Sequence, residues 1–368
     1  MAERDEAFMR LALRLAARGR GKVEPNPMVG CVAVRDGEVV GKGYHRRYGG
    51  PHAEVNAVRD AGGDVAGATV YVTLEPCVHT GKTLPCVDLL IEQRPACVVV
   101  AMRDPFPEVA GRGVRALRRA GISVEVGLLD EDARELNAPY LKRVETGLPY
   151  VIAKWAMTLD GKIATSAGDS KWITSDEARR YAHRVRGRMD AVIVGIGTAL
   201  ADDPELTCRL ARPRREAKRV VLDSRARLPA ESKLARSARD VPVVVAATGG
   251  ALAKRTERLM RLGCRVVELP QRQGRVDVTE LLAYLGEMGM TNVLVEGGAE
   301  TLGSFFGARQ VDEVMAFVGP RVLGGPGLLP VAGEQVARIA DAVAVADLAT
   351  HRLGDSILLH GRVRMQQA

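Results

Sequence analysis

The sequence has no long apolar run, only six scattered cysteines and few aromatic residues. No stretch approaches the roughly 18–20 consecutive apolar residues that span a bilayer, and the acidic, helically spaced N-terminus does not match a secretory signal. Six cysteines in 368 residues exclude a disulfide scaffold. These absences, together with 46% hydrophobic and 27% charged residues, predict a cytoplasmic globular enzyme with two domains of ordinary size.

Lysine is also scarce, because it supplies only 10 of the 53 basic residues and arginine supplies the others. The formal net charge of +8 comes mostly from residues 148–368, which hold 32 basic and 25 acidic residues, whereas residues 1–147 hold 21 and 20. A basic half favours phosphate-bearing ligands or nucleic acid. Arginines on a solvated surface, or a compositional bias of the genome, account for the same excess.

The apolar pattern forms two separate series of strands and helices, which indicates an α/β fold for each half. Gly147 and Pro149 separate the two series, so we predict one domain at 1–147 and a second at 148–368. In the first we expect strands at 29–34, 38–44, 69–74, 97–102 and 122–126, and helices at 5–18, 52–61, 86–93 and 112–120. In the second we expect strands at 150–157, 190–195, 219–224, 241–247, 264–269, 292–298 and 313–319, and helices at 175–188, 251–262, 277–288 and 299–308.

One histidine and two cysteines stand where helices are expected to begin. His52 and Glu54 lie in "GPHAEVNA", and Cys77 and Cys86 each follow a proline. Proline is tolerated at a helix start, and the N-terminal end of a helix favours a thiolate. One imidazole and two thiolates can hold a catalytic zinc, which lowers the pKa of a bound water toward about 7. The pattern predicts one Zn²⁺ per chain, held by His52, Cys77 and Cys86, with Glu54 as the proton shuttle of a deaminase.

The spacing of the cysteines differs from the usual deaminase pattern, in which two residues separate them. Eight residues, "VHTGKTLP", separate Cys77 from Cys86 here. His79 and Lys82 lie in this insertion, and Asn26 lies between two prolines before the first strand. Each of these three either contacts substrate or has a structural role. The other cysteines lie in or beside apolar runs and are interpreted as buried free thiols: Cys31, Cys97, Cys208 and Cys264.

The second half reveals less through its residues alone. It lacks a G-x-G-x-x-G after its first strand, which argues against a Rossmann dinucleotide site. In "VEGGAETLGSFF" a strand, two glycines and a helix follow one another. Backbone N–H groups at such a helix start bind phosphate, although glycines that only cap a helix produce the same pattern. The stretch "GIGTALADDP" is a second glycine-rich turn after a strand.

Several longer stretches indicate a family. The first half resembles the cytidine-deaminase-like superfamily, and "PNPMVGC", "GYHRRYGGPHAEVNA", "AMRDPFPEVAGRG" and the wide cysteine spacing resemble the deaminase of riboflavin biosynthesis. The second half resembles the reductase of the same pathway in "AMTLDGKIA", "GDSKWITS", "ALADDPELTCR", "VLDS" and "LVEGGAETLGSFF". Nearly the whole chain is thus similar to the bifunctional deaminase–reductases of riboflavin biosynthesis.

This resemblance implies a fold and two reactions. The expected fold is an N-terminal cytidine-deaminase-like αβα sandwich followed by a C-terminal dihydrofolate-reductase-like α/β domain. The first reaction is zinc-hydroxide hydrolytic deamination of 2,5-diamino-6-ribosylamino-4(3H)-pyrimidinone 5′-phosphate. The second is NADPH-dependent reduction of the ribosyl to the ribityl side chain.

The resemblance also implies the residues of the reductase site. It places the following residues on NADPH: Ala156, Trp172, Thr198, Asp202, Ser224, Gly298, Ala299, Glu300, Thr301, Leu302, Gly303 and Ser304. It places these on the substrate: Ser170, Arg186, Leu206, Arg209 and Glu296. The forked guanidinium groups of Arg186 and Arg209 match the oxygens of a sugar phosphate. Lys154 lies close to this set in the sequence and receives no role.

Two other interpretations fit part of the sequence. A nucleic-acid base deaminase with a basic RNA-binding half has the same zinc residues, but aromatic residues at 4% and the lack of an aromatic–basic platform oppose it. A deaminase with a non-catalytic second half, used for binding or oligomerisation, is opposed by the retained reductase side chains. We therefore expect a small phosphorylated pyrimidine as substrate, no nucleic acid or membrane partner, and a homo-oligomer (a dimer or a tetramer).

Overall fold

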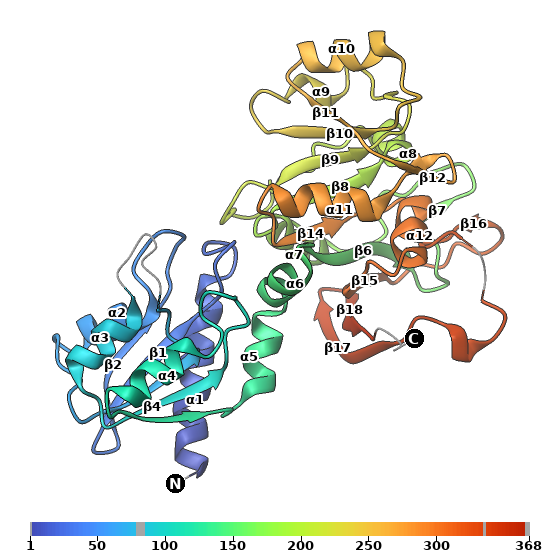
Figure 1. Ribbon diagram of the computed structural model, residues 1–368. Coiled ribbons are helices and arrows are strands. Elements are labelled where there is room, and N and C mark those ends of the chain that lie inside the picture. The colour runs from blue at the N-terminus through green and yellow to red at the C-terminus, as the bar shows by residue number, and fades with distance from the viewer. Residues whose placement is uncertain (1, 79–84, 334–335, 365–368) are drawn as a thin grey trace. The chain divides into compact units, whose positions relative to one another are not determined.

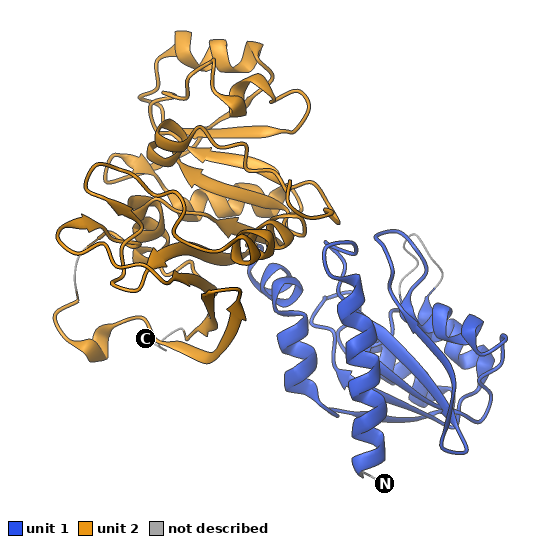
Figure 2. Ribbon diagram, turned by 180° about the vertical axis from the view of Figure 1, so that it is seen from behind, with its two compact units in different colours: residues 1–147 blue, residues 148–368 orange. Residues whose placement is uncertain are grey.

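The structure is a computed structural model, and it describes residues 2–78, 85–333 and 336–364. It divides into two compact units, Met1–Gly147 and Leu148–Ala368 (Figure 2). His79 and Lys82 lie outside the described residues. Among the described residues, none of the helices combines the length and the apolar character needed to cross a membrane.

Unit 1 is built on a five-stranded mixed sheet (Figure 1). Its strands are β1 (Gly30–Arg35), β2 (Glu38–Tyr44), β3 (Thr69–Leu74), β4 (Cys97–Met102) and β5 (Ser123–Val126), in the order β2-β1-β3-β4-β5. Strand β1 is antiparallel to β2 and β3, and β3, β4 and β5 are parallel. The central strands are rich in valine because both of their faces are covered by helices.

Helices cover both faces of this sheet, so unit 1 is an αβα sandwich. One layer contains α1 (Ala2–Ala16), α5 (Asp130–Leu136) and α6 (Ala138–Thr146), and buries Met9 and Tyr140 against the sheet. The 3-10 turn η1 (Ala17–Gly19) follows α1. The other layer contains α2 (Ala53–Asp60), α3 (Cys86–Gln93) and α4 (Arg112–Arg119), and buries Leu90 and Leu117.

Glycine 43 fixes the position of α2 on the sheet. A Cβ atom on Gly43 would lie 2.4 Å from the Ala53 carbonyl oxygen, which is far below van der Waals contact. Only glycine therefore allows the first turn of α2 to pack this closely on β2. That turn carries Glu54 and follows His52, so this packing positions both side chains.

Unit 2 contains a nine-stranded sheet in the order β11-β10-β9-β8-β14-β6-β15-β18-β17. The strands are β6 (Tyr150–Thr158), β8 (Ala191–Gly195), β9 (Lys218–Leu222), β10 (Val243–Ala247), β11 (Arg265–Glu268), β14 (Asn292–Val295), β15 (Glu313–Gly319), β17 (Val345–Leu353) and β18 (Ser356–Val363). The strands from β11 to β15 in this order are parallel, and β18 and β17 are antiparallel. Two small sheets pair β7 (Ala164–Thr165) with β16 (Gly327–Leu328) and β12 (Gln271–Arg272) with β13 (Arg275–Val276).

The helices of unit 2 connect the parallel strands. They are α7 (Asp176–Arg186), α8 (Ile196–Asp202), α9 (Lys233–Arg236), α10 (Ala253–Arg261), α11 (Val278–Glu287) and α12 (Ala299–Gly307), with a 3-10 turn η2 (Ile339–Asp341). Leu281, Leu285 and Phe305 pack with the strands in one core. Because parallel strands point the same way, the loops that follow β8, β9, β10 and β14 meet at one edge of the sheet.

Three sequence-based expectations about local structure were wrong or incomplete. The stretch "GIGTALADDP", predicted as a turn, contains helix α8, in which Ile196 and Ala199 are buried at helical spacing. Strands β17 and β18 were not expected, because most residues of β17 are exposed and show no apolar alternation. Helices α5 and α6 were also not expected.

Candidate active sites

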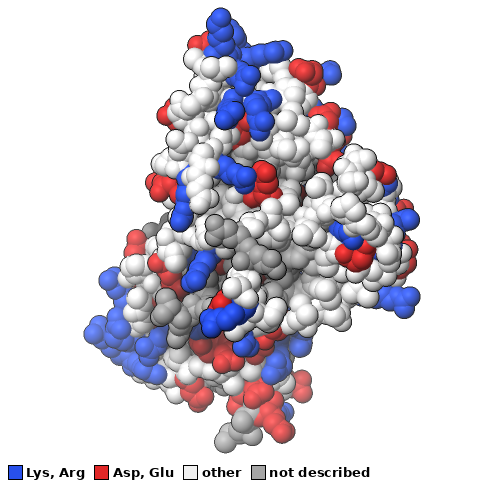
Figure 3. Space-filling model, turned by 90° about the vertical axis from the view of Figure 1, so that its right-hand side faces the viewer, with Lys and Arg blue, Asp and Glu red and all other residues white. Residues whose placement is uncertain are grey.

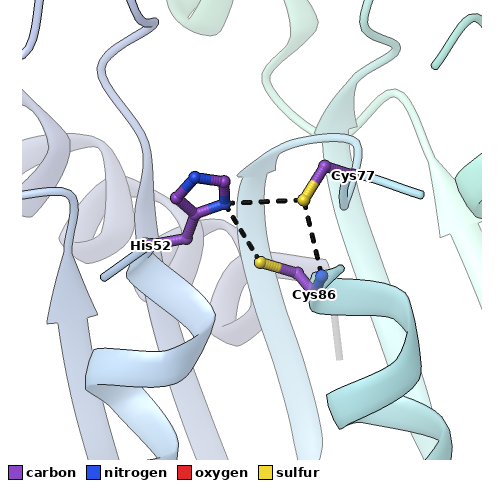
Figure 4. Close-up of side chains that lie close together, drawn as sticks. All are labelled: His52, Cys77 and Cys86. Atoms are coloured by element: carbon purple, nitrogen blue, oxygen red, sulfur yellow. Dashed lines mark hydrogen bonds between the residues drawn. The ribbon is translucent and has the colours of Figure 1, made fainter. Parts of the chain in front are cut away.

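The metal-ligand candidates of unit 1 converge from three segments (Figure 4). His52 precedes the first residue of α2, Cys86 is the first residue of α3, and Cys77 follows β3. His52 Nδ1 lies 3.3 Å from Cys86 Sγ and 3.5 Å from Cys77 Sγ. Their ligand atoms all lie within 4.8 Å of one another. One nitrogen and two sulfurs at this separation fit a catalytic zinc site with one open position.

The electrostatics of this cluster favour metal binding. Hydrogen bonds from Cys86 and His52 lower the pKa of the Cys77 thiol to about 4, so Cys77 favours the thiolate form that binds metal. The Cys86 backbone N–H has no acceptor within α3, because it stands at the start of the helix, and it donates to Cys77 Sγ over 3.4 Å. The side-chain hydrogen bond with Cys77, followed by burial, raises the pKa of Cys86.

Glu54 lies next to the ligands and is 3% exposed. Burial, followed by the charge of Cys77, raises the pKa of its carboxyl group above the ordinary range. A carboxyl group that is buried beside the metal ligands and does not itself belong to the ligand set can exchange protons with a bound water. This geometry suits the proton-shuttle role predicted for Glu54.

His45 is a site residue that sequence reasoning did not single out. Its ring lies edge-on to the His52 ring at a centroid distance of 5.3 Å. Its Nδ1 lies 3.1 Å from the Pro51 carbonyl oxygen, which makes Nδ1–H the donor and leaves Nε2 to accept from Asn26 Nδ2 at 3.4 Å. Asn26 is thus held beside the ligand cluster. The motif "GYHRRYGGPHAEVNA" contained His45, but nothing in its spacing marked it.

Glu75 supports the segment that carries Cys77. It is 3% exposed, and its carboxylate accepts hydrogen bonds from the backbone N–H groups of Gly111 and Val114, each over 3.0 Å, and of Asp104 over 3.4 Å. These bonds connect the start of the Cys77 segment to the loop before α4. Only Pro76 separates Glu75 from Cys77, so this anchoring positions the ligand.

We expect Glu75→Ala to destabilise unit 1 by about 2–4 kcal/mol, because it leaves buried backbone donors unpaired. Circular dichroism during urea unfolding should show the loss. Tryptophan fluorescence should not, because both tryptophans, Trp155 and Trp172, belong to unit 2. Glu92→Ala, at an exposed position of α3, is the matched control. An unchanged unfolding midpoint for Glu75→Ala would contradict the anchoring role.

In unit 2, an ion cluster surrounds Glu296 after β14. The Arg186 guanidinium holds the Glu296 carboxylate with two parallel hydrogen bonds, one through Nε and one of 2.6 Å through Nη2. Lys154 Nζ lies 3.6 Å from Glu296 Oε2. Although burial opposes ionisation, Arg186 and Lys154 lower the pKa of Glu296 to about 2. The structure therefore brings Glu296 and Arg186 together and adds Lys154.

Arg209 lies close to this cluster. Its backbone N–H donates over 3.0 Å to Nδ1 of His183, which is itself within electrostatic reach of Arg186 and Glu296. Its guanidinium is exposed and pairs with Glu205 at 3.1 Å. The buried Arg186 guanidinium is already bound by Glu296, whereas the Arg209 guanidinium is exposed to solvent. Arg209 is therefore the better placed of the two to bind a phosphate. Leu206 is 3% exposed with a φ of 56°, and Ser170 lies in the segment between β7 and α7.

His183 is a second residue that sequence reasoning missed. It is 7% exposed, and burial, followed by the charges of Arg186 and Arg209, lowers the pKa of its imidazole to about 4. The neutral ring is what allows Nδ1 to accept the Arg209 N–H. Because the folded pKa lies below the unfolded value of about 6.5, the unfolded state binds more protons at this group between about pH 6.5 and 4, and unit 2 loses stability as the pH falls through that range.

We expect the stability of unit 2 to fall by up to about 3 kcal/mol through this group as the pH falls from 6.5 to 4. In His183→Asn, the amide oxygen can accept the Arg209 N–H and does not titrate, so the decline should be shallower. Urea unfolding followed by tryptophan fluorescence at several pH values measures the difference. Parallel pH profiles for the two proteins would show that His183 makes no such contribution.

The residues predicted to contact NADPH lie mainly at the carboxyl edge of the parallel strands. The Gly298 N–H donates to Thr198 Oγ1 over 2.9 Å, so the start of α12 and the start of α8 meet. Ser224 follows β9, and its Oγ accepts the Val276 N–H over 3.1 Å. Asp202 pairs with Lys171 at 3.6 Å.

The remaining cofactor candidates differ in how far their side chains are exposed to solvent. Trp172 is 59% exposed and faces Arg179, whose guanidinium carbon lies 4.1 Å from the ring centroid. Ala156 is half-buried in β6. Leu302 is fully buried in the core, and a Cβ on Gly303 would meet the Ala332 carbonyl oxygen at 1.9 Å. These two residues face protein, whereas Ala299, Glu300 and Ser304 lie on the more exposed side of α12.

All six cysteines are free. Cys31 and Cys264 are buried, as expected for structural thiols, whereas Cys97 and Cys208 are only half-buried. The expectation of full burial was therefore wrong for Cys97, at the start of β4, and for Cys208. Cys208 Sγ lies 3.2 Å from the Ala211 carbonyl oxygen.

Comparison with known proteins covers both units. The zinc-binding region of cytidine and deoxycytidylate deaminases matches residues 2–102, and the RibD C-terminal domain matches residues 149–359. Riboflavin biosynthesis protein RibD of Actinobacillus pleuropneumoniae is 42% identical over 356 residues, which cover 96% of this chain and 94% of that protein. RibD of Escherichia coli is 40% identical over 363 residues, which cover 97% and 98%.

Solved structures of similar proteins share the fold. Acinetobacter baumannii RibD, form 1, has a TM-score of 0.85 at 36% identity and covers 99% of this chain and 100% of that one. A diaminohydroxyphosphoribosylaminopyrimidine deaminase/5-amino-6-(5-phosphoribosylamino)uracil reductase of Thermotoga maritima has a TM-score of 0.84 at 36% identity, with 99% of both chains covered.

These findings define a bifunctional enzyme, in which a zinc-dependent deaminase is joined to an NADPH-dependent reductase. The chain belongs to the RibD family of riboflavin biosynthesis proteins. The fold class, the two activities and the two cofactors expected from the sequence are confirmed. The roles of individual residues stay predictions.

Proposed function

We propose that unit 1 deaminates 2,5-diamino-6-ribosylamino-4(3H)-pyrimidinone 5′-phosphate and that unit 2 reduces the ribosyl side chain of the product. The observation that carries the proposal is the cluster of His52, Cys77 and Cys86 beside the buried Glu54. It occurs in a chain that is similar to RibD proteins over nearly its full length. The deamination consumes one water, replaces the ring 2-amino group by a carbonyl oxygen and releases ammonia.

In the deaminase site, His52, Cys77 and Cys86 would hold Zn²⁺, which as a Lewis acid makes a bound water acidic enough to give up a proton near neutral pH. Glu54 accepts that proton and delivers it to the departing amine. Asn26, held by His45, offers its amide to the edge of the pyrimidine ring. Burial of Glu54 keeps bulk water from competing for the proton.

In the reductase site, the protein positions C1′ of the sugar and balances charge, and NADPH supplies the hydride. Glu296 holds Arg186 and Lys154 in place through buried ion pairs. Arg209 binds the sugar phosphate through its exposed guanidinium. Lys154 is the nearest cation to this carboxylate besides Arg186, and we assign it the positioning of the sugar hydroxyls.

The first experiment gives the zinc-loaded protein the diaminopyrimidinone ribosyl phosphate, with and without NADPH, and follows the products by mass spectrometry. We expect a mass increase of about one unit without NADPH, as NH is replaced by O, and a further gain of two hydrogens with it. Deamination without reduction would show that unit 2 is a binding or oligomerisation module. Lack of any reaction would refute the substrate assignment and favour the RNA base deaminase interpretation, which salt-dependent RNA binding would test.

The assembly and location of the protein stay predictions. We propose a homo-oligomer, either a dimer or a tetramer, in the cytoplasm. Light scattering after size-exclusion chromatography measures the mass directly against the 39.5 kDa of one chain. A monomeric mass at micromolar concentration would refute the oligomer.

A further inference from the structure

The carboxyl edge of the unit 2 sheet continues beyond the start of α12. Thr198, Ser224 and Thr248 follow the neighbouring strands β8, β9 and β10. The Gly298 N–H bonds to Thr198, and Thr248 Oγ1 donates to the Ser224 carbonyl oxygen over 2.9 Å. Ligands of open α/β sheets bind along this edge. The edge therefore offers a continuous polar path from α12 to β10.

The length of this path suits a dinucleotide. Neighbouring strands lie about 4.8 Å apart, so β9 lies roughly 10 Å and β10 roughly 14 Å from β14, which precedes α12. A pyrophosphate bound at the start of α12 then places the adenosine of the cofactor over β9 and β10. The group attached to the ribose 2′ position falls near the turn that follows β9.

Two arginines meet at that turn. Arg225 directly follows Ser224, and Arg255 lies in the first turn of α10, where its Nη1 lies 3.5 Å from the Arg225 carbonyl oxygen. Both side chains are exposed. Within the described part of the chain, neither makes an ion pair, whereas the nearby Arg227 and Arg258 pair with Asp223 and Glu231.

The surroundings of the two arginines favour an anion. Lys and Arg side chains gather at the upper end of unit 2, around α10 (Figure 3). Asp223 is fully buried, and its carboxylate accepts backbone N–H groups of this turn, that of Leu228 over 2.7 Å, so it is turned toward the backbone and away from solvent. Glu268, at the end of β11, lies beside Gly249, one strand further along the edge. The Ser224 hydroxyl accepts the Val276 N–H and keeps its own proton free to donate.

We propose that Arg225 and Arg255 bind the ribose 2′-phosphate of NADPH, with the Ser224 hydroxyl donating to the same phosphate. Arginine near the ribose selects a 2′-phosphate, whereas an acidic residue there selects a free 2′-hydroxyl. Neither guanidinium group has a carboxylate partner, so each can bind phosphate oxygens by giving up water alone, without breaking an ion pair. The inference rests on the proposed reductase function and deepens it by assigning the cofactor preference to two residues.

The test compares ligands that differ only in the 2′-phosphate. Isothermal titration calorimetry measures adenosine 2′,5′-bisphosphate and 5′-AMP, and quenching of tryptophan fluorescence measures NADPH and NADH. We expect Arg225→Ala/Arg255→Ala to weaken the binding of NADPH and of the bisphosphate by about 10- to 100-fold. The binding of NADH and 5′-AMP should stay unchanged. Arg261→Ala, at the exposed far end of α10, removes one positive charge outside the proposed subsite and serves as the control.

Each outcome decides a different point. Loss of the preference for 2′-phosphate in the double variant, with a normal melting temperature and a normal Arg261→Ala control, supports the subsite. If wild-type protein prefers NADPH and the double variant keeps that preference, the subsite lies elsewhere and the proposed reductase function stands. If wild-type protein binds neither NADPH nor NADH, the reductase function fails, and the subsite with it. Arg225→Gln/Arg255→Gln repeats the measurement if the alanine variant melts early.

Discussion

Glu54→Gln is expected to lower the rate of deamination by about 10³-fold while the reduction of deaminated substrate continues at the wild-type rate. The glutamine amide has nearly the shape of the carboxyl group but cannot take up and release a proton. His52, Cys77 and Cys86 are unchanged, so the protein should keep one zinc per chain. Ammonia release measures the deamination, and elemental analysis measures the zinc.

The control for this variant is Glu92→Gln, which removes the same charge at an exposed position of α3. It should deaminate as fast as the wild type. If Glu54→Gln kept its zinc and deaminated within tenfold of the wild type, Glu54 would not be the proton shuttle. Loss of zinc together with activity would show instead that Glu54 supports the ligand cluster.

Glu296→Gln is expected to lower kcat/KM of the reduction by about 10²-fold and to leave the deamination unchanged. The variant removes the carboxylate shared by Arg186 and Lys154, whose side chains are only 15% and 18% exposed. Leaving one partner of a buried ion pair uncompensated costs about 3–5 kcal/mol. Both cations should therefore reorient or lose charge, which disturbs the site where the sugar binds.

Separate measurements of kcat, KM and NADPH affinity identify the cause of that loss. A rise in KM for the pyrimidine substrate, together with a fall in kcat and normal quenching by NADPH, would place Glu296 on the substrate side of the site. Weaker NADPH binding with a normal KM would place it on the cofactor side and contradict our assignment. Glu287→Gln, exposed at the end of α11, is the matched control.

The metal cluster was predictable from sequence because its signals are local. A proline precedes each of the three ligands, and His52 and Cys86 stand at the starts of α2 and α3 as expected. The expected helix start was wrong for Cys77, which lies in the segment after β3. Helix α2 follows β2 and α3 follows β3, and these two strands flank β1 and both run antiparallel to it, so the two helix starts lie at the same edge of the sheet. His45 escaped prediction because its role depends on two contacts, with Asn26 and with the Pro51 carbonyl oxygen, that no spacing reveals.

The ion cluster of unit 2 was predictable only through resemblance. Arg186 and Glu296 are 110 residues apart in the sequence and meet because β14 lies between β8 and β6. This strand order cannot be derived from the apolar pattern, which fixes each element but not its neighbours. His183 was missed, and Lys154 was named without a role, for the same reason. A lone histidine on a helix and a lone lysine in a strand carry no signal of their own.

The sequence by itself determined the class of each half, the family, and the choice of His52, Cys77 and Cys86 as metal-ligand candidates. Periodicity and motif spacing are properties of neighbouring residues, so they can be recognised before the chain folds. The tertiary structure alone decided which residues share a site. Strand order set Lys154 and Arg186 against Glu296, and the parallel carboxyl edge brought Arg255 beside Arg225. Burial and charge act through space, so their effects on His183 and Glu296 appear only once the chain has folded.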